Sequence, residues 1–233
     1  MIGEQVYLMT SAELSMIAAA SGLKRFLMFE GDEMPDREHQ LQAVFRLARD
    51  GFFVCGESTI RPGEALRSIL PAIKHPAAVV AMRSASDQTP PACLYWHDEQ
   101  ETLQVTPHGC RRGFYELSLR KADPLLEDLE ARGLLPVQPD DRFAEPDNED
   151  EYVARKLAGL SKFKDEDNIR EVFGADLISI CDRYDPLGCA VTDCLLIVQG
   201  TFTPHMVLVS ALGLRAVAYS RDGFIKWLKG AIS

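Results

Sequence analysis

The sequence predicts an α+β fold: antiparallel sheets with helices on one face, built from two pseudo-repeated helix–ββββ–helix units. Three observations lead to this class. Apolar residues recur at helical spacing through the first 74 residues, and from residue 77 the spacing becomes strand-like. Short polar turns join the strand-like runs, which favours antiparallel neighbours. The same order of elements then returns after an acidic segment that contains prolines.

The first helix is expected at 11–21, where Thr10 or Ser11 is a suitable N-cap and Gly22 ends the helix. A second helix is expected at 36–50, before Gly51. Its apolar residues form one stripe at helical spacing, which we expect to face the core: Leu41, Val44, Phe45 and Ala48.

A third helix is expected at 62–74, with Pro71 distorting or shortening its last turn. Its inner face would consist of Leu66, Ile69, Leu70 and Ile73. Short apolar runs at 25–29 and 52–56 are predicted to be strands, one before and one after the second helix.

Four strands are expected next, at 77–82, 92–97, 102–106 and 114–120, followed by a helix at 123–133. In this helix Asp123 is placed as N-cap, Pro124 as the first helical residue and Gly133 as the residue after the last turn. These three signals agree on both ends of the helix.

The chain is predicted to divide into an N-terminal α+β half (1–135), an acidic, Pro-containing linker (136–150) and a C-terminal α+β half (151–233). The second half would hold helices near 151–160, 165–173 and 222–232, and strands at 176–183, 189–199, 204–210 and 214–220. Five elements match their counterparts in the first half at an offset of about 100 residues, which suggests an internal duplication.

Composition excludes several classes of function. The net charge of -10 argues against a nucleic-acid partner, because phosphate backbones are bound by clustered Lys and Arg. No apolar run approaches the length that spans a bilayer, and the N-terminal residues do not resemble a signal peptide, so we expect a cytoplasmic protein with no membrane partner. The six cysteines form no C-x-x-C pair and are expected to be reduced and buried.

No motif indicates a catalytic or cofactor site, and we expect neither an enzyme nor a cofactor. Phosphate-binding loops are missing, and Ser58 lacks the second glycine of a nucleophile elbow. The carboxylates occur in runs that are typical of solvated loops. If the strands at 92–97 and 102–106 form a hairpin, four potential zinc ligands could cluster near the strand ends, which leaves a metal site open: His97, Asp98, His108 and Cys110.

Aromatic residues offer the only candidate binding site that the sequence marks. Tyr95 and Trp96 would point to opposite faces of one strand, so at most one of them belongs to the core, and the same holds for Phe114 and Tyr115. Exposed aromatic residues on a sheet are typical anchors for a protein partner. A covering helix would explain them equally well.

The order of features resembles the EspG-type chaperones of type VII (ESX) secretion systems. The residues that carry the resemblance are 9-MTSAELSMIAAASGL-23, 47-LARDGFFV-54 and 66-LRSILPAIKHPAAVVAM-82. It implies a pseudo-duplicated α+β fold and a non-enzymatic function, in which a cytoplasmic adaptor or chaperone binds small secreted proteins that form helical hairpins. Two alternatives stay open: an enzyme with an unrecognised site, and an acidic winged-helix-like regulator that uses the helix at 62–74.

Overall fold

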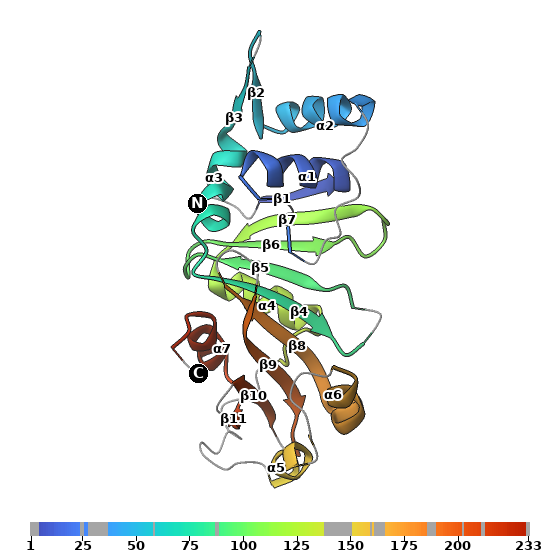
Figure 1. Ribbon diagram of the computed structural model, residues 1–233, viewed down its shortest axis with the longest axis vertical. Coiled ribbons are helices and arrows are strands. Elements are labelled where there is room, and N and C mark those ends of the chain that lie inside the picture. Colours follow the sequence, from blue (N-terminus) through green and yellow to red (C-terminus); the bar gives the residue numbers. More distant parts are fainter. Residues whose placement is uncertain are drawn as a thin grey trace. The chain divides into compact units, whose positions relative to one another are not determined.

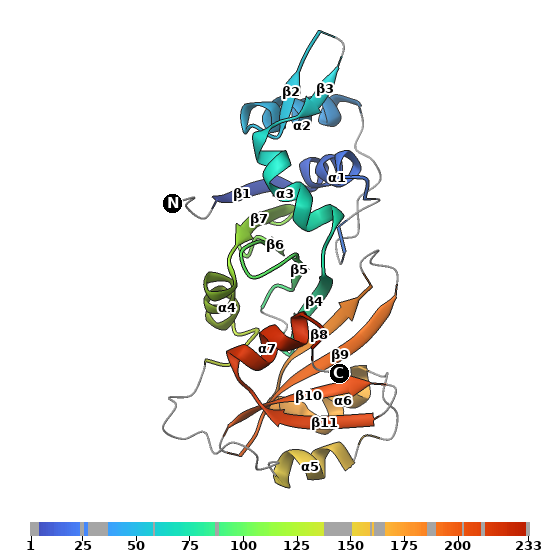
Figure 2. The ribbon, with the colours of Figure 1, turned by 90° about the vertical axis from the view of Figure 1, so that its left-hand side faces the viewer.

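The computed structural model describes residues 5–23, 26–27, 37–57, 59–86, 89–137, 151–158, 160, 166–185, 190–201, 203–210 and 213–231. The chain forms two compact units, shown in Figures 1 and 2. Unit 1 comprises Met1–Val79 and Ala92–Lys121, and unit 2 comprises Val80–Pro91 and Ala122–Ser233. Antiparallel strand ladders with packed helices make up both units, which confirms the α+β class.

Unit 1 is built on a sheet whose strand order is β1-β7-β6-β5-β4. Its helices pack against this sheet, α1 on β1 and β7, and α3 on β5 and β6. A separate two-stranded hairpin, β2–β3, projects beside α2 (Figure 1). The elements are β1 (Gln5–Thr10), α1 (Ser11–Ala20), α2 (Arg37–Arg49), β2 (Phe53–Cys55), β3 (Ile60–Pro62), α3 (Glu64–Lys74), β4 (Ala78–Ser84), β5 (Ala92–Trp96), β6 (Thr102–Pro107) and β7 (Phe114–Arg120).

Strand β1 was not expected from the sequence, yet it pairs with β7 over its whole length, from Gln5↔Leu119 to Thr10↔Phe114. Its side chains alternate, so that Met9 is buried while Val6 and Leu8 are exposed. The strand expected at 25–29 lies mostly outside the described residues. Its described members are not in a strand: the Phe26 ring packs edge-on against Tyr95 instead.

Helix α2 forms where it was expected, but it buries a different face. Ala43 and Leu47 point into the core, whereas Leu41 is 52% exposed and Phe45 71% exposed. The apolar stripe of the sequence is real, but it extends well beyond the part of the helix that α1 covers. The expectation that Leu41 and Phe45 face the core is therefore wrong.

Helix α3 buries Leu66, Ile69 and Ile73 as expected, while Leu70 is half-buried. Pro71 does not shorten the helix, which continues to Lys74. The ring of Pro71 is exposed, so it stays clear of the packed face.

Unit 2 has the strand order β4-β8-β9-β10-β11 and carries helices on both faces, whereas one covered face was expected. Neighbouring residues of a strand point to opposite faces of the sheet, so the contacts of two neighbours in β8 show which helices cover each face. The hydroxyl of Ser179 donates to the carbonyl of Leu134, just after α4, while Ile180 packs with Val153 of α5 and with α6. The elements are α4 (Ala122–Ala131), α5 (Glu151–Ala158), α6 (Glu166–Phe173), the 3-10 turn Gly174–Asp176, β8 (Leu177–Tyr184), β9 (Val191–Gln199), β10 (Pro204–Ser210), β11 (Gly213–Ala218) and α7 (Arg221–Leu228).

Helix α4 was assigned to the N-terminal half but belongs to unit 2. Two polar contacts hold it there. Arg221 of α7 donates to both carboxylate oxygens of Glu130, and Ser179 bonds to the chain after the helix. Of the expected linker, residues 138–150 lie outside the described residues, and the duplication of the two halves stays a prediction.

The base of the β2–β3 hairpin is closed by two glycines. Gly51 has a φ of +79°, and a Cβ on Gly63 would lie 2.1 Å from the carbonyl oxygen of Gly51. The amide of Gly63 also donates to the carbonyl of Phe52, at 2.7 Å. No side chain fits at Gly63 without moving this backbone.

We expect Gly63→Ala to lower the free energy of unfolding by about 1–3 kcal/mol, the usual cost of overpacking. Gly109→Ala is the matched control, since no atom lies within 4 Å of its added Cβ and its φ is not positive. Thermal and urea unfolding of the two variants checks this. Equal stability of both variants would contradict the close contact at the hairpin base.

Candidate functional site

The four aromatic residues marked by the sequence do not lie together on the surface. Tyr95 and Trp96 are both buried, with 4% and 1% exposure, so the expectation that at most one belongs to the core is wrong. The Tyr95 hydroxyl accepts from the amide of Leu27, and burial raises the pKa of this phenol. Phe114 and Tyr115 are half-buried at the start of β7, and Arg111 lies 5.9 Å from the centre of the Phe114 ring. Their role as partner contacts stays a prediction.

The four potential metal ligands are not brought together. His97 and Asp98 lie before β6, and His108 and Cys110 lie after it, so a strand of six residues, about 20 Å long, separates the two pairs. The Nδ1 of His97 bonds to the carbonyl of His75, and Asp98 caps its own turn by accepting from the amides of the two residues before β6. Among the residues that the structure describes, no group of three or more His, Cys, Asp or Glu could hold a metal ion.

The cysteines differ in exposure. All five described cysteines are free thiols; Cys93 and Cys181 are buried, whereas Cys55 and Cys110 are exposed, which corrects the expectation that all are buried. Desolvation raises the pKa of the Cys181 thiol to about 12, and it raises those of Cys93 and Cys194 as well. A thiol that stays protonated at neutral pH is a poor nucleophile, so these three side chains are structural.

The exposed apolar side chains of unit 1 gather around α2 and the β2–β3 hairpin. Leu41, Phe45 and Ile60 are all more than half exposed. Beside them lies a groove of about 370 Å³ between α1, α2 and the hairpin, lined by Met16, Ala19, Ala20, Gln40, Phe53, Ile60, Arg61 and Pro62. We call these lining residues together with Leu41 and Phe45 the α2–hairpin surface.

This groove suits binding better than catalysis. Its lining is mostly aliphatic or aromatic, and Arg61 is its only ionisable residue. Acid–base or nucleophilic chemistry requires at least one group with a proton to give or take near neutral pH, and a guanidinium stays protonated. The arrangement can bury apolar side chains and contact one anionic group.

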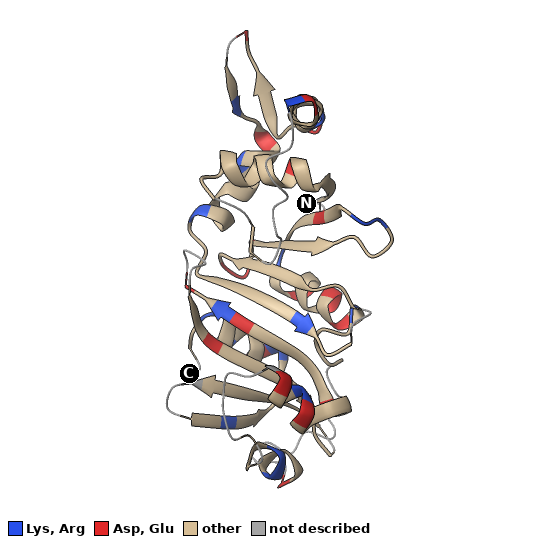
Figure 3. Ribbon diagram, turned by 45° about the vertical axis from the view of Figure 1, so that its right-hand side comes forward, with Lys and Arg blue, Asp and Glu red and all other residues tan. Residues whose placement is uncertain are grey.

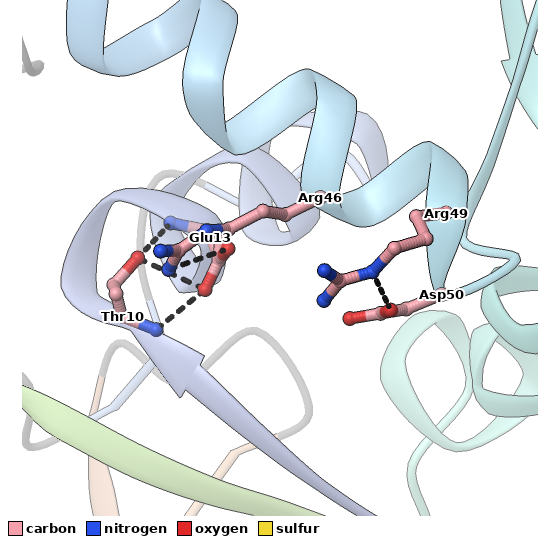
Figure 4. Close-up of polar contacts among 5 residues, drawn as sticks. All are labelled: Thr10, Glu13, Arg46, Arg49 and Asp50. Carbon is pink, nitrogen blue, oxygen red and sulfur yellow. Dashed lines mark hydrogen bonds and ion pairs between the residues drawn. The ribbon is translucent and has the colours of Figure 1, made fainter.

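Glu13 is 5% exposed and has polar contacts with both α1 and α2. Figure 4 shows these contacts. One oxygen of Glu13 accepts from the amide of Thr10 at 2.7 Å, and the Thr10 hydroxyl accepts from the amide of Glu13 at 3.3 Å. This reciprocal capping box begins α1. The other carboxylate oxygen lies 3.7 Å from the guanidinium of Arg46, on α2. A single carboxylate therefore both caps α1 and contacts α2.

Sequence reasoning came close to this surface without identifying it. The stripe with Leu41 and Phe45 was recognised but was interpreted as core. The three-residue strand β3, which forms one wall of the groove, was not expected at all. The signal in the sequence is that the apolar arc of α2 is wider than one neighbouring helix can cover.

The capping box predicts a graded loss of stability. We expect Thr10→Ala to lower the free energy of unfolding by about 1 kcal/mol and Glu13→Ala by about 2 kcal/mol, since Glu13→Ala removes the bonds of a charged acceptor. Glu13→Gln should lose less, because its amide oxygen can still accept from Thr10. Urea unfolding checks the order, with Glu57→Ala, at an exposed turn, as the control. A Glu13→Ala variant as stable as this control would contradict the role of the carboxylate.

The cysteine environments predict a labelling pattern. Iodoacetamide at pH 8 should modify Cys55 and Cys110, whereas burial and a raised pKa should protect Cys93 and Cys181 until urea unfolds the chain. The thiol of the half-buried Cys194 should react slowly, because its pKa is also raised. Peptide mapping by mass spectrometry identifies the modified positions. Rapid modification of Cys93 or Cys181 in the folded protein would be inconsistent with this core.

Comparison with known proteins shows a weak likeness of fold. No family model and no curated protein matches the chain. Among solved structures, the chain is similar to the "Structure of the Mycobacterium tuberculosis type VII secretion system chaperone EspG5 in complex with PE25-PPE41 dimer". The match has 10% identity and a TM-score of 0.48, and it covers 97% of this chain and 95% of that chain. At this level the likeness establishes neither family membership nor function.

Proposed function

We propose that this protein is a non-enzymatic, protein-binding adaptor or chaperone that uses the α2–hairpin surface to bind its client. The observation that carries the proposal is the exposure of Phe45 and Leu41, side by side on α2, next to an apolar groove. Exposed apolar patches that adjoin a groove mark interaction sites on protein surfaces. Leu41 and Phe45 are 52% and 71% exposed, so covering the rest of each side chain would stabilise a complex by roughly 1–2 kcal/mol.

The client class follows from the resemblance in the sequence and is part of the proposal. It would be a small secreted protein, or a pair of them, that presents a helical hairpin and is held by the chaperone in the cytoplasm before type VII-like secretion. A groove with an apolar rim is the usual receptor for the apolar face of a helix, whose anchors recur at i, i+3, i+4 and i+7. Phe114 and Tyr115, half-buried in the same unit, remain proposed additional contacts.

In the described part of the chain, no helix has the length and apolar character that crossing a bilayer requires. The longest of them, α2, has 13 residues and carries three arginines. The exposed apolar side chains of α2 therefore belong to an amphipathic helix that packs on α1, and a protein partner is the kind of molecule that we propose for them.

The test is co-purification from the native host. Tagged wild-type chain should recover one or two small helical proteins in a stoichiometric complex, and a Leu41→Asp/Phe45→Asp variant should lose them, because each charge would be buried unpaired in the interface. Val191→Asp is the matched control, since Val191 is also 52% exposed but lies on β9 of unit 2.

Loss of the client in the α2 variant alone, with unchanged thermal unfolding, would support the proposal. Retention of the same client by the α2 variant would place the binding site elsewhere. A client that is neither small nor helical would contradict the proposed class.

A further inference from the structure

We propose that the α2–hairpin surface selects an amphipathic client helix whose apolar face is bordered by acidic residues. This inference rests on the proposed function and specifies the chemistry of the partner. It starts from two observations: the order of side chains around α2, and the local sign of the charge, which is opposite to that of the whole chain.

The apolar arc of α2 runs from the groove to the solvent, and Arg37, in the first turn, is the one charged residue within it. Each residue of an α-helix turns by about 100°, so that Val44, Ala48, Leu41 and Phe45 follow one another in this order, starting from Gln40 at the groove. Val44 and Ala48 are half-buried, and Leu41 and Phe45 are exposed. A docked helix could place apolar side chains both in the groove and over Phe45.

Cations border this arc. Around the helix, Phe45 is followed first by Glu38, in the first turn, and then by Arg49, in the last turn. Arg37 lies one turn before Leu41, and Arg61 lines the groove on the hairpin side. Glu38 is the only acidic residue within α2, against three arginines. Residues 37–74 contain six basic and four acidic residues, although the whole chain has a net charge of -10. Figure 3 colours the basic residues blue and the acidic residues red along the ribbon.

At contact distance the local charge decides the preference. Charges more than about 8 Å away are largely screened at physiological ionic strength, so the acidic remainder of the chain has little influence on a helix seated on α2. Two of the arginines already have carboxylate neighbours: Arg49 bonds to Asp50 at 3.0 Å, and Arg46 lies near Glu13. The Arg49–Asp50 pair is exposed, and such pairs contribute little, so Arg49 remains able to contact a client carboxylate.

An anionic membrane is a less suitable partner than a helix. The surface is concave between α1, α2 and the hairpin, and a flat bilayer cannot fill a groove. Glu38 and Asp50 also lie on or next to α2, and Glu57 is exposed at the hairpin turn. The carboxylates of a client helix can lie between these acidic residues. A continuous anionic surface would also face the acidic residues themselves and be repelled by them.

The experiment compares peptides of about 20 residues, long enough to form helices, with leucines at i, i+3, i+4 and i+7 repeats. One peptide has Glu at the positions that border the leucines, one has Lys and one has Gln. Fluorescence anisotropy with the full chain measures binding at low and high salt. We expect the Glu peptide to bind about tenfold more tightly than the Lys peptide, with the advantage reduced by salt.

Charge reversal provides the decisive variant. Arg37→Glu/Arg49→Glu should remove or invert the preference for the Glu peptide. The control, Arg112→Glu/Lys121→Glu, changes the net charge equally at two other exposed positions of unit 1 and should retain the preference.

Four outcomes would overturn the inference. Equal binding of the Glu and Lys peptides, abolished by Phe45→Asp, would leave the proposed function intact but remove the charge selection. If no peptide binds, while the native client is recovered by the wild-type chain and lost by Phe45→Asp, the proposed function would stand but the client would not be recognised as an amphipathic helix. If the chain sediments with vesicles of anionic lipid and the Phe45→Asp variant does not, the partner of this surface would be a membrane. Dimerisation that requires Phe45, seen by sizing, would indicate a second copy of this chain.

Discussion

The carboxylate of Glu13 joins two elements of unit 1. It lies where β1 turns into α1, and it fixes that turn through the capping box with Thr10. The same side chain also contacts Arg46, so that one carboxylate links the start of α1 to α2. On the side that faces α1, helix α2 buries Ala43 and Leu47, and its apolar arc beyond them stays exposed.

The two units use their sheets differently. In unit 2, α5 and α6 cover one face of β8–β11, and α4 and α7 lie on the other, so its apolar side chains are largely satisfied within the unit. In unit 1 the apolar side chains of α2 and the hairpin exceed what α1 can cover. The surface that we propose for the client thus lies where the secondary structure of unit 1 leaves apolar area uncovered.

Local signals predicted most of the fold, and non-local ones were missed. Gly133, with a φ of +71°, ends the segment of α4 as its sequence indicated, although the helix begins at Ala122, before the expected N-cap Asp123. Strand β1 could not be inferred, because its partner β7 is more than a hundred residues away and its own six residues carry no turn signal. Tyr95 and Trp96 were misjudged for the same reason: burial of both faces of β5 depends on distant segments. The site was missed because periodicity shows that a helix has an apolar face but not how much of that face is covered.

The close contact of Gly51 and Gly63 separates the tip of the β2–β3 hairpin from the rest of the fold. Residues between these glycines form a loop whose ends are joined by backbone alone, through the bonds from Gly63 to Phe52 and from Ala65 to Gly51. The entropy of closing such a loop grows only slowly with its length. The residues of the tip beyond the buried Phe52 and Phe53 can therefore change in sequence or length while α2 and α3 keep their positions. Related chains could acquire different clients by altering this loop alone.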